Sequence, residues 1–367
     1  MKSNWIRFLA GVIASAVLVG AFALTGGMKN GKRTDGLLYQ ASGLHPDGEL
    51  LLIDGQTVTA EEYLYWLAQD CDYLSGQVEG LDWDAAVTED MTFGAYAKAD
   101  ALEAVKQHAV VRAWAGEAGI GLTDADKAEL EAQRQQYVTY YGSEESFLQR
   151  LAVMGVSEAA WDMIQTGQYL YRNLYEAFCT PGSGLYPDDK TLSDYAAQQG
   201  YVSVYALKIT GDNADTMAAD LLDRWQAAED KETEYMLMCD ELQQVADGVV
   251  TLAYAEGDAL SEAMSALAVG DMTAVIDPYG EGTCFVVLRA DTDLAAVAET
   301  YFDVLFESKL DSAAVVTNSK LYDALDVGAF YEKLTQLRAE MEAAMEPADV
   351  RTGTDADAED TPADPAA

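Results

Sequence analysis

ELLLIDGQTVTAEEYLYW, residues 49–66, is the stretch that decides the fold. Its pattern predicts a short strand, a tight turn at Asp54-Gly55, a second short strand and then a helix. The Asp-Gly pair suits a turn that needs a positive φ. Thr59 and Glu62 have the spacing of a capping box, in which each side chain binds the backbone N–H of the other residue. We therefore expect the helix to begin directly after Thr59.

The composition indicates a globular chain with more than one domain. At 367 residues, 50% of them hydrophobic, the sequence has room for two cores plus tails. It is too apolar for wholesale disorder.

The formal net charge of −41 excludes one class of partner, because 22 basic residues face 63 acidic ones. Binding DNA or RNA needs Lys and Arg to neutralise phosphates, so we expect no nucleic-acid partner. Adsorption to anionic lipid is disfavoured for the same reason. Solubility or salt adaptation is the favoured interpretation of such acidity, and steering of basic unfolded polypeptides is the second.

A single hydrophobic run near the N-terminus predicts membrane attachment. Residues 8–24 carry no charge and follow Lys2 and Arg7. A helix of this length spans about 26 Å, which is short for a bilayer and long for a signal-peptide core. We expect an uncleaved single-pass transmembrane anchor, which with its linker covers residues 1–33. The alternative is a signal peptide cleaved near Ala23, and charge does not settle the orientation because Lys and Arg flank the run on both sides.

The cysteines and histidines limit the chemistry of any site. The four cysteines show no CxxC spacing, and the chain has only two histidines, so no zinc site can be assembled. We expect no metal and no cofactor. Buried free thiols are the favoured interpretation of the cysteines. An even count in an exported chain would also permit two disulfides, Cys71–Cys179 and Cys239–Cys284.

The middle of the chain carries the periodicity and the punctuation of helices. Apolar repeats between Ser or Thr caps and Gly stops predict four of them, over residues 94–118, 123–142, 143–155 and 157–174. Thr123 and Asp126 stand in a near-capping-box position at the start of the second helix.

The order of these motifs resembles the exported SurA/PrsA-like peptidyl-prolyl isomerase and chaperone family. IDGQTVTAEEYLYWL resembles the family's opening, and GIGLTDADKAELE followed by YYGSEESFLQRLAVMGVSEAAW resembles its helical chaperone domain. The resemblance implies an extracytoplasmic body at the cell membrane that binds unfolded or nascent exported polypeptides.

Residues 190–293 resemble the parvulin isomerase domain of the same family. YVSVYALKIT, then AMSALAVGDMTAVIDPYG, then FVVLR follow the order of its strands and helices. The resemblance implies an α+β fold in which this small domain is inserted into a mainly helical chaperone domain over 47–185. Helices over 294–340, with a polar break at Val315-Val316, are expected to return and pack on the chaperone domain. The composition of residues 341–367 predicts a disordered acidic tail.

The parvulin-like segment lacks the two histidines that the family uses. The resemblance places Tyr205 at the first position and Cys284, or its neighbour Thr283, at the second, and no His follows residue 108. Isomerisation needs no covalent chemistry, because a catalyst only has to favour the twisted state of the prolyl amide. Activity through the Tyr205 hydroxyl therefore remains an alternative, but we expect no efficient isomerase activity.

Apolar side chains in both parts are candidates for peptide binding. Aromatic rings in the helical part suit an unfolded segment, although they also suit a core. The candidates are Tyr63, Trp66, Trp114 and Trp161 in the helical part and, as the resemblance implies, Leu207, Met264 and Phe285 in the parvulin-like part.

Three functions are compatible with such a chain. The first is a membrane-anchored extracytoplasmic chaperone or foldase for unfolded exported polypeptides. The alternatives are an active peptidyl-prolyl cis-trans isomerase and a non-catalytic cell-surface scaffold that binds one folded partner.

Overall fold

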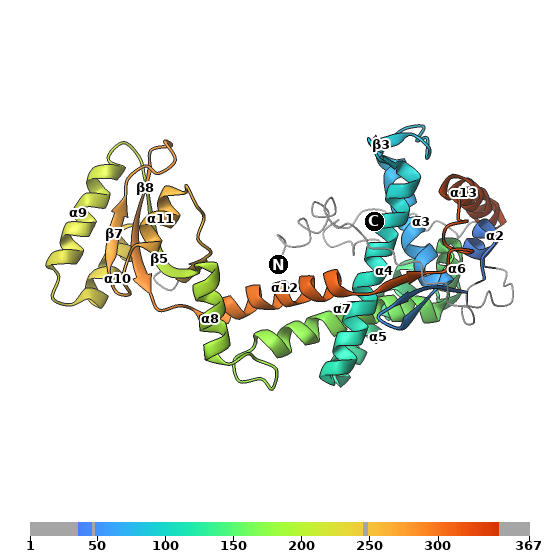
Figure 1. Cartoon of the computed structure of the whole chain (residues 1–367), viewed down its shortest axis with the longest axis horizontal. Helices are drawn as coiled ribbons and strands as arrows, with labels where there is room; N and C mark the ends of the chain where they lie inside the picture. The colour runs from blue at the N-terminus through green and yellow to red at the C-terminus, as the bar shows by residue number, and fades with distance from the viewer. Residues whose placement is uncertain (1–35, 46–47, 245–248, 345–367) are drawn as a thin grey trace. The chain divides into compact units, whose positions relative to one another are not determined.

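The computed structural model describes residues 36–45, 48–244 and 249–344. The chain divides into two compact units (Figure 1): unit 1 comprises residues up to 174 and from 307 onward, and unit 2 comprises residues 175–306. Helices dominate and all paired strands are antiparallel, so the predicted α+β class is confirmed.

Two predicted segments fall wholly or mostly outside the described residues. They are the membrane anchor at 8–24 and the acidic tail at 341–367, of which only residues 341–344 are described. Within the described ranges no helix is both long and apolar enough to cross a bilayer. The predicted start of the tail is wrong, because residues 341–344 complete helix α13 (Val327–Ala344).

The turn at Asp54-Gly55 joins two strands of unit 1 as predicted. β1 (Glu49–Ile53) pairs with β2 (Gln56–Thr59), and φ is 48° at Asp54 and 77° at Gly55. A third strand, β9 (Val315–Thr317), pairs with the other edge of β1. The predicted polar break at Val315-Val316 is therefore a strand that closes the sheet of unit 1.

The helices of unit 1 follow the predicted punctuation. Thr123 and Ser143 accept backbone N–H groups at the starts of two helices, and Gly142 and Gly155 end them with a φ of 88° each. Outside the β3–β4 hairpin (Ala86–Thr88 and Met91–Thr92), unit 1 contains α2 (Leu37–Ser42), α3 (Ala60–Gln77), α4 (Phe93–Ala118), α5 (Asp124–Tyr141), α6 (Glu144–Met154), the first part of α7 (Glu158–Cys179), the end of α12 (Leu294–Ser312) and α13.

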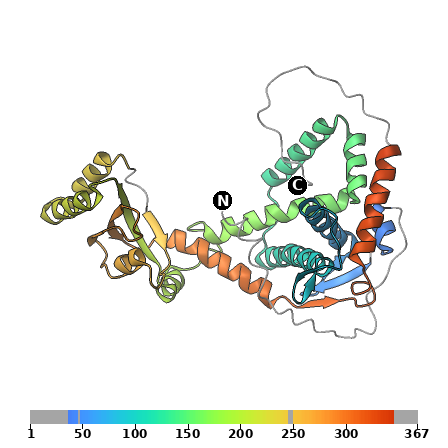
Figure 2. The same cartoon turned by 90° about the horizontal axis from the view of Figure 1, so that it is seen from above.

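The core of unit 1 lies between its sheet and its longest helices. β1 and α3 contribute side chains with no exposed area, such as Leu50, Ile53 and Leu64. α3 packs along α4, and α13 packs against α2 and α4 (Figure 2). The core therefore joins the N-terminal helices to the C-terminal one.

The capping box expected at the start of α3 is only half formed. The Thr59 hydroxyl accepts the N–H of Glu62 at 3.4 Å. The Glu62 carboxylate, however, accepts both terminal nitrogens of Arg112, at 2.7 and 3.3 Å. Glu62 is 3% exposed, and a buried carboxylate is better stabilised by a guanidinium than by one N–H. Thr123 and Asp126, which match the capping-box motif less well, form the complete box at the start of α5.

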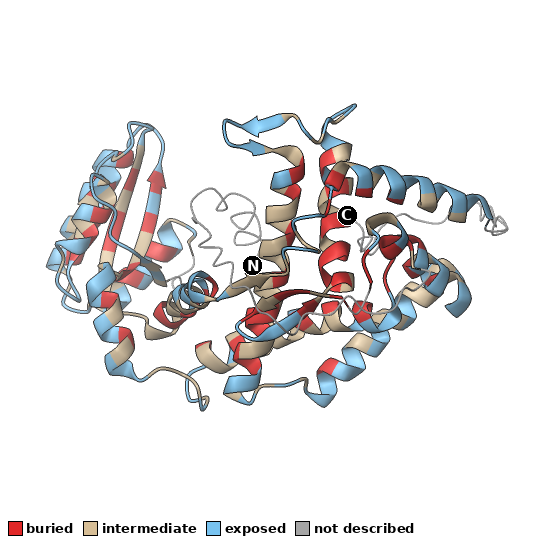
Figure 3. Cartoon of the chain, turned by 45° about the vertical axis from the view of Figure 1, so that its right-hand side comes forward, coloured by how far each residue is buried: buried red, intermediate tan, exposed pale blue. Residues whose placement is uncertain are grey.

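Unit 2 is built on a four-stranded antiparallel sheet. Its strands are β5 (Val202–Thr210), β6 (Val249–Leu252), β7 (Met272–Val275) and β8 (Thr283–Ala290), in the spatial order β6-β5-β8-β7. Buried residues gather on the strands, whereas the outer faces of the helices are largely exposed (Figure 3). The two central strands, β5 and β8, pair from Ser203 to Thr210.

Helices cover both faces of this sheet. α9 (Ala214–Ala227) and α10 (Lys231–Glu241) pack on one face, and α11 (Ala259–Ser265) packs on the other. α8 (Asp189–Gln199) packs against the unit 2 part of α12. The sheet is thus a wall between two separate clusters of apolar side chains.

Candidate peptide-binding site

A groove in unit 1 lies between α5 and α7 and encloses about 450 Å³. Leu130 and Tyr137 reach it from α5, and Trp161 reaches it from α7. These positions recur at helical spacing, so one face of each helix supplies the apolar wall. The groove therefore has the aromatic lining that an unfolded segment can use.

The rings in this wall hold one another in place. The Tyr137 ring lies edge-to-face against the Trp161 ring, with centroids 5.8 Å apart, and stacks on Phe147 at 6.4 Å. Phe147 belongs to α6 and is 2% exposed. Because the rings contact the core of unit 1 behind them, the wall is preformed rather than loose.

Polar groups surround the apolar wall. Gln133, Gln165 and Thr166 line the groove and are half-buried. Their amides and hydroxyl both donate and accept, which suits the N–H and C=O groups of an extended main chain. Charged side chains also line the groove, among them Lys127, Glu131 and Asp162. The groove thus combines apolar contact with main-chain hydrogen bonding and with charges of both signs.

Arg134 ties the three helices around the groove together. Its guanidinium binds Glu144, the first residue of α6, with one contact at 3.0 Å, and Glu158, the first residue of α7, at 2.5 Å. It also lies 5.4 Å from the centroid of the Phe147 ring. Both carboxylates stand in the first turn of a helix, where negative charge is favoured.

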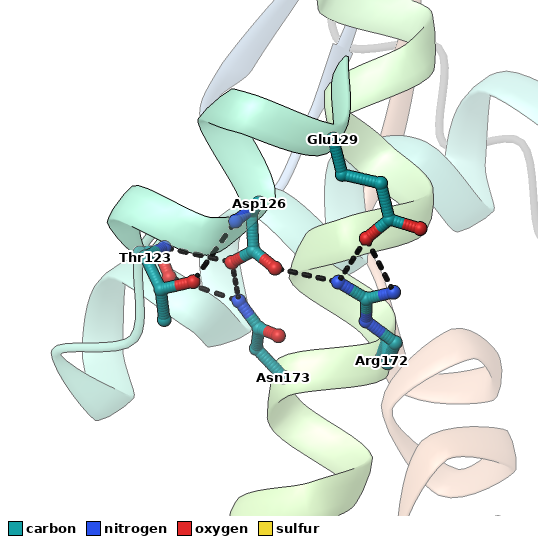
Figure 4. A network of polar contacts seen from close by, with 6 residues as sticks. Thr123, Asp126, Glu129, Arg172 and Asn173 are labelled. Atoms are coloured by element: carbon teal, nitrogen blue, oxygen red, sulfur yellow. Dashed lines mark hydrogen bonds and ion pairs between the residues drawn. The ribbon is translucent and has the colours of Figure 1, made fainter. Parts of the chain in front are cut away.

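A second polar network fixes the start of α5 to α7 (Figure 4). Asp126 accepts the N–H of Thr123 and the side-chain amide of Asn173, both at 2.7 Å, and an Arg172 nitrogen at 2.5 Å. Arg172 also binds Glu129 at 3.2 Å. The Asn173 hydrogen bond, followed by that of Thr123, holds the pKa of Asp126 well below its usual range. The network keeps the two walls of the groove at a fixed separation.

Three of the four predicted binding rings are core residues. Tyr63, Trp114 and Trp161 are 0%, 5% and 3% exposed, so these rings contribute to the core, and their contact with a peptide stays a prediction. Of these, only Trp161 also lines the groove. Trp66 is half-buried and its ring lies 5.1 Å from that of His108. An aromatic ring at helical spacing marks a buried face as well as a binding face, which is why the sequence could not separate the two.

The two positions predicted to replace the family histidines lie apart. Tyr205 and Cys284 lie on the same face of the unit 2 sheet, but Cys284 pairs with Ile209. Four residues along β5 correspond to about 13 Å. Cys284 is 2% exposed, and the Tyr205 ring lies 5.4 Å from Tyr235 of α10. The structure therefore does not bring this predicted pair together as a site.

The predicted peptide-binding residues of unit 2 are divided between the two faces of its sheet. Leu207 belongs to the cluster under α9 and α10 and is 1% exposed, whereas Met264 and Phe285 belong to the cluster under α11. Phe285 is half-buried and contacts the Tyr279 ring at 6.4 Å. Only the α11 face combines a predicted residue with an accessible ring, because Tyr279 is 51% exposed.

All four cysteines are buried free thiols, which the sequence favoured over disulfides. In unit 2, Cys239 and Cys284 lie in the same apolar cluster. Burial is the first cause that raises the pKa of the Cys71 and Cys179 thiols, the latter to about 12. Such thiols stay protonated at neutral pH and act as small apolar side chains.

Sequence reasoning missed two features of unit 1. The sequence does not predict Leu130 and Arg134 as site residues, because a single Leu and a single Arg on a polar helix do not indicate a groove. A second cavity, of about 600 Å³, contains Trp83 in its wall. Trp83 follows Leu81-Asp82 in a stretch without periodicity, and only its three-dimensional neighbours mark it as part of a site. Among the described residues no group of His, Cys, Asp and Glu is placed to hold a metal ion.

Comparison with known proteins finds similar solved structures. The foldase protein PrsA from Streptococcus pneumoniae is 12% identical, with a TM-score of 0.22, over 70% of this chain and 94% of its own. Those from Lactococcus lactis and Bacillus subtilis are each 14% identical, with TM-scores of 0.29 and 0.24. They cover 78% and 74% of this chain and 98% and 96% of their own.

All three are PrsA proteins, which belong to the family that the motifs resemble. No protein-family model matches the sequence, and no curated protein matches it.

Proposed function

We propose that this protein is a chaperone or foldase that holds unfolded polypeptide in the groove between α5 and α7. One observation carries the proposal: a preformed aromatic wall of Tyr137 and Trp161 faces half-buried amides in a groove of about 450 Å³. Apolar contact with generic main-chain hydrogen bonding recognises many sequences weakly. That is the requirement for a protein that binds non-native chains rather than one folded partner.

Leu130→Gln tests this proposal. Leu130 lines the groove and is half-buried, so a polar amide there removes apolar contact without emptying the core. We expect at least a few-fold weaker suppression of aggregation of a chemically denatured client, since about 1–2 kcal/mol of apolar contact is lost. Light scattering during dilution of the client from denaturant measures the effect.

Leu148→Gln is the matched control. Leu148 lies on α6, is 39% exposed and does not line the groove. It should suppress aggregation as the wild type does, and circular dichroism should show both variants folded. Equal activity of Leu130→Gln, Leu148→Gln and wild type would refute the groove as the binding site.

Unit 2 is proposed to be a parvulin-like domain without efficient isomerase activity. Its order of elements, β5-α9-α10-β6-α11-β7-β8, and the motifs over residues 190–293 support this assignment. The chain's only histidines are His45 and His108, so residues 175–306 contain no imidazole. Met264 and Phe285 on the α11 face are proposed as a contact for polypeptide, and Leu207 as part of the supporting core.

An isomerase assay on X-Pro peptides separates this proposal from the enzyme alternative. The uncatalysed barrier of about 18–20 kcal/mol makes even modest catalysis measurable. We expect no rate enhancement from the wild-type chain. A clear enhancement that Tyr205→Phe abolishes would instead establish the active isomerase, because the Tyr205 hydroxyl is the replacement at the first histidine position.

The helical part over residues 47–185, with the returning segment 294–340, is proposed as the polypeptide-holding part of an extracytoplasmic protein. Residues 8–24 are proposed as its membrane anchor. The scaffold alternative differs in its partners. Crosslinking in the native cell should give many partners for a chaperone and one dominant partner for a scaffold.

A further inference from the structure

The cavity of about 600 Å³ in unit 1 has an aromatic wall and an acidic rim. It lies between the end of α3, the segment before β3 and the first turn of α13. We call it the Trp83 cavity. Its wall contains the rings of Trp83 and Tyr331, and its rim carries Asp82, Asp84, Asp326 and Glu332.

The aromatic wall is rigid because each ring is held from behind. The centroids of Trp83 and Tyr331 lie 5.4 Å apart, edge-to-face. The Trp83 carbonyl accepts the N–H of Gly94 at 2.9 Å. A Cβ at Gly328 would lie 3.4 Å from the Trp83 ring, an ordinary van der Waals contact, so the first turn of α13 lies directly beside the indole. The Tyr331 hydroxyl donates to Asp72 at 2.9 Å.

The rim is negative and no cation of the described chain pairs with it. Asp82, Asp84, Asp326 and Glu332 are all exposed, and none forms an ion pair with another described residue. The Lys98 ammonium, whose charge acts on Asp326, donates to the carbonyls of Tyr322 and Leu325 at 2.7 and 3.3 Å. Two rim carboxylates have one backbone partner each: Asp82 accepts the N–H of Asp84, and Asp326 accepts that of Ala329.

These features suit one kind of ligand. The face of an indole attracts a cation through its quadrupole, and Trp is the strongest such ring. Uncompensated carboxylates at the mouth add charge attraction that extends to about 10 Å at ordinary salt. A metal ion would need converging oxygen ligands, and no such group exists among the described residues. The volume also exceeds what a bare ion would occupy and fits a long side chain with its main chain.

We propose that the Trp83 cavity binds a lysine or arginine side chain of an unfolded polypeptide. The inference rests on the proposed chaperone function for the class of ligand. The cation lies over the Trp83 ring, and Asp84 and Glu332 neutralise it from the rim. Basic segments are then preferred over neutral ones, while the groove between α5 and α7 supplies contact that is independent of sequence.

The test compares two labelled unfolded peptides that differ only in having Lys or Gln at the same positions. Fluorescence anisotropy measures their binding to the full chain. We expect the Lys peptide to bind several-fold more tightly and to lose about tenfold in affinity with Trp83→Leu or with Asp84→Asn/Glu332→Gln. The Gln peptide should be unaffected by these variants. Raising the salt concentration should lower the affinity for the Lys peptide and leave that for the Gln peptide unchanged.

Asp90→Asn is the control for overall charge. Asp90 is exposed in the β3–β4 turn and does not line the cavity. If Asp90→Asn lowers the affinity for the Lys peptide as much as the rim variants do, the peptide is bound through the overall negative charge of the protein. That result would overturn the cavity inference. Equal binding of the Lys and Gln peptides also overturns it.

Failure of the proposed function gives a different result. If the Gln peptide binds and Leu130→Gln weakens it, the chaperone proposal stands whatever happens at the cavity. If neither peptide binds, the chaperone proposal fails. In that case N-acetyl-lysine methylamide, titrated against wild type and Trp83→Leu by NMR, tests the cavity alone: loss of binding in the variant supports the site, and absence of binding to the wild type overturns it.

Discussion

Asp70 and Asp100 form a half-buried pair of carboxyl groups on neighbouring helices. Asp70 lies on α3 and Asp100 on α4. Burial, and then the neighbouring Asp100, raise the pKa of Asp70 to about 8. Burial also raises the pKa of Asp100. The Oδ2 atom of Asp70 is buried and has no hydrogen-bond partner among the described residues. The pair therefore holds a proton at neutral pH.

This proton predicts that stability falls as pH rises. The unfolded chain releases it near pH 3.8, whereas the folded chain keeps it until about pH 8. The stability that this bound proton contributes is fully present below pH 3.8 and is lost progressively as the pH rises to about 8. We expect the free energy of unfolding of the wild type, relative to Asp70→Asn, to fall by about 1 kcal/mol per pH unit in this window. Urea unfolding at a series of pH values measures it, and parallel curves for the two proteins would contradict it.

At the residue scale, the sequence identified chemistry more readily than position. The absence of imidazole beyond residue 108 is a fact of the sequence and limits unit 2 directly. Whether Tyr63 faces a core or a ligand depends on distant residues, because its hydroxyl donates to the Lys98 carbonyl and its ring contacts that of Tyr322 at 5.3 Å. The Glu62 carboxylate shows the same limit, since its partner Arg112 lies 50 residues away. The local spacing predicts that Glu62 caps its helix, whereas in the folded protein its buried carboxylate binds the guanidinium of Arg112.

At the element scale, the turn between β1 and β2 has two tasks. It reverses the chain, and it also binds the segment that leads into β9. The Asp54 Oδ1 atom accepts the N–H of Ala314 at 2.8 Å, and the Asp54 N–H donates to the Ala314 carbonyl at 3.0 Å. Asp54 therefore links two edges of the sheet while its backbone keeps a φ of 48°.

Replacing Asp54 should destabilise unit 1. We expect Asp54→Ala to lower the free energy of unfolding by about 1–3 kcal/mol, because it removes the acceptor and leaves a side chain poorly suited to positive φ. Asp54→Asn keeps an oxygen and tolerates the left-handed region, so its loss should be much smaller. Denaturant unfolding monitored by circular dichroism compares the two. Equal stability of the Ala and Asn variants would show that the bond to Ala314 contributes nothing.

Elements with local signals were predictable, and elements with distant partners were not. The bounds of α5 and α6 follow from Thr123, Gly142, Ser143 and Gly155, because caps and stops act within one turn of helix. β9 spans only Val315–Thr317, and the contact that anchors its start is 260 residues away in sequence. A three-residue strand has too little alternation to be recognised without its neighbour.

At the scale of the whole molecule, the net charge of −41 should make stability depend on salt. Repulsion among the carboxylates opposes the compact state, and counterions screen it. We expect the thermal midpoint to rise between about 0.02 and about 0.5 M NaCl, by about 2–4 °C for each kcal/mol gained. Differential scanning fluorimetry measures this. A midpoint that falls with salt would mean that the ion pairs outweigh the repulsion.

The sequence predicts two units but not the residues at which they divide. Pro and Gly residues near 181–187 give a local break, and the motif order gives an insertion. The boundaries between the units fall within the sequences of α7 and α12. Contacts within unit 2, such as Tyr175 with Phe302 at 5.4 Å, assign the end of α7 to that unit. Such ring contacts between segments more than a hundred residues apart have no counterpart in local pattern.

The strand order β2-β1-β9 has a consequence for biosynthesis. Residues 175–306 leave the ribosome as one continuous piece, before Val315–Thr317 exist. Unit 2 can therefore finish folding while the edge of β1 that pairs with β9 is still unpaired. An unpaired strand edge is the type of surface that pairs with strands of other chains. A polypeptide stalled before residue 315 would carry that edge permanently.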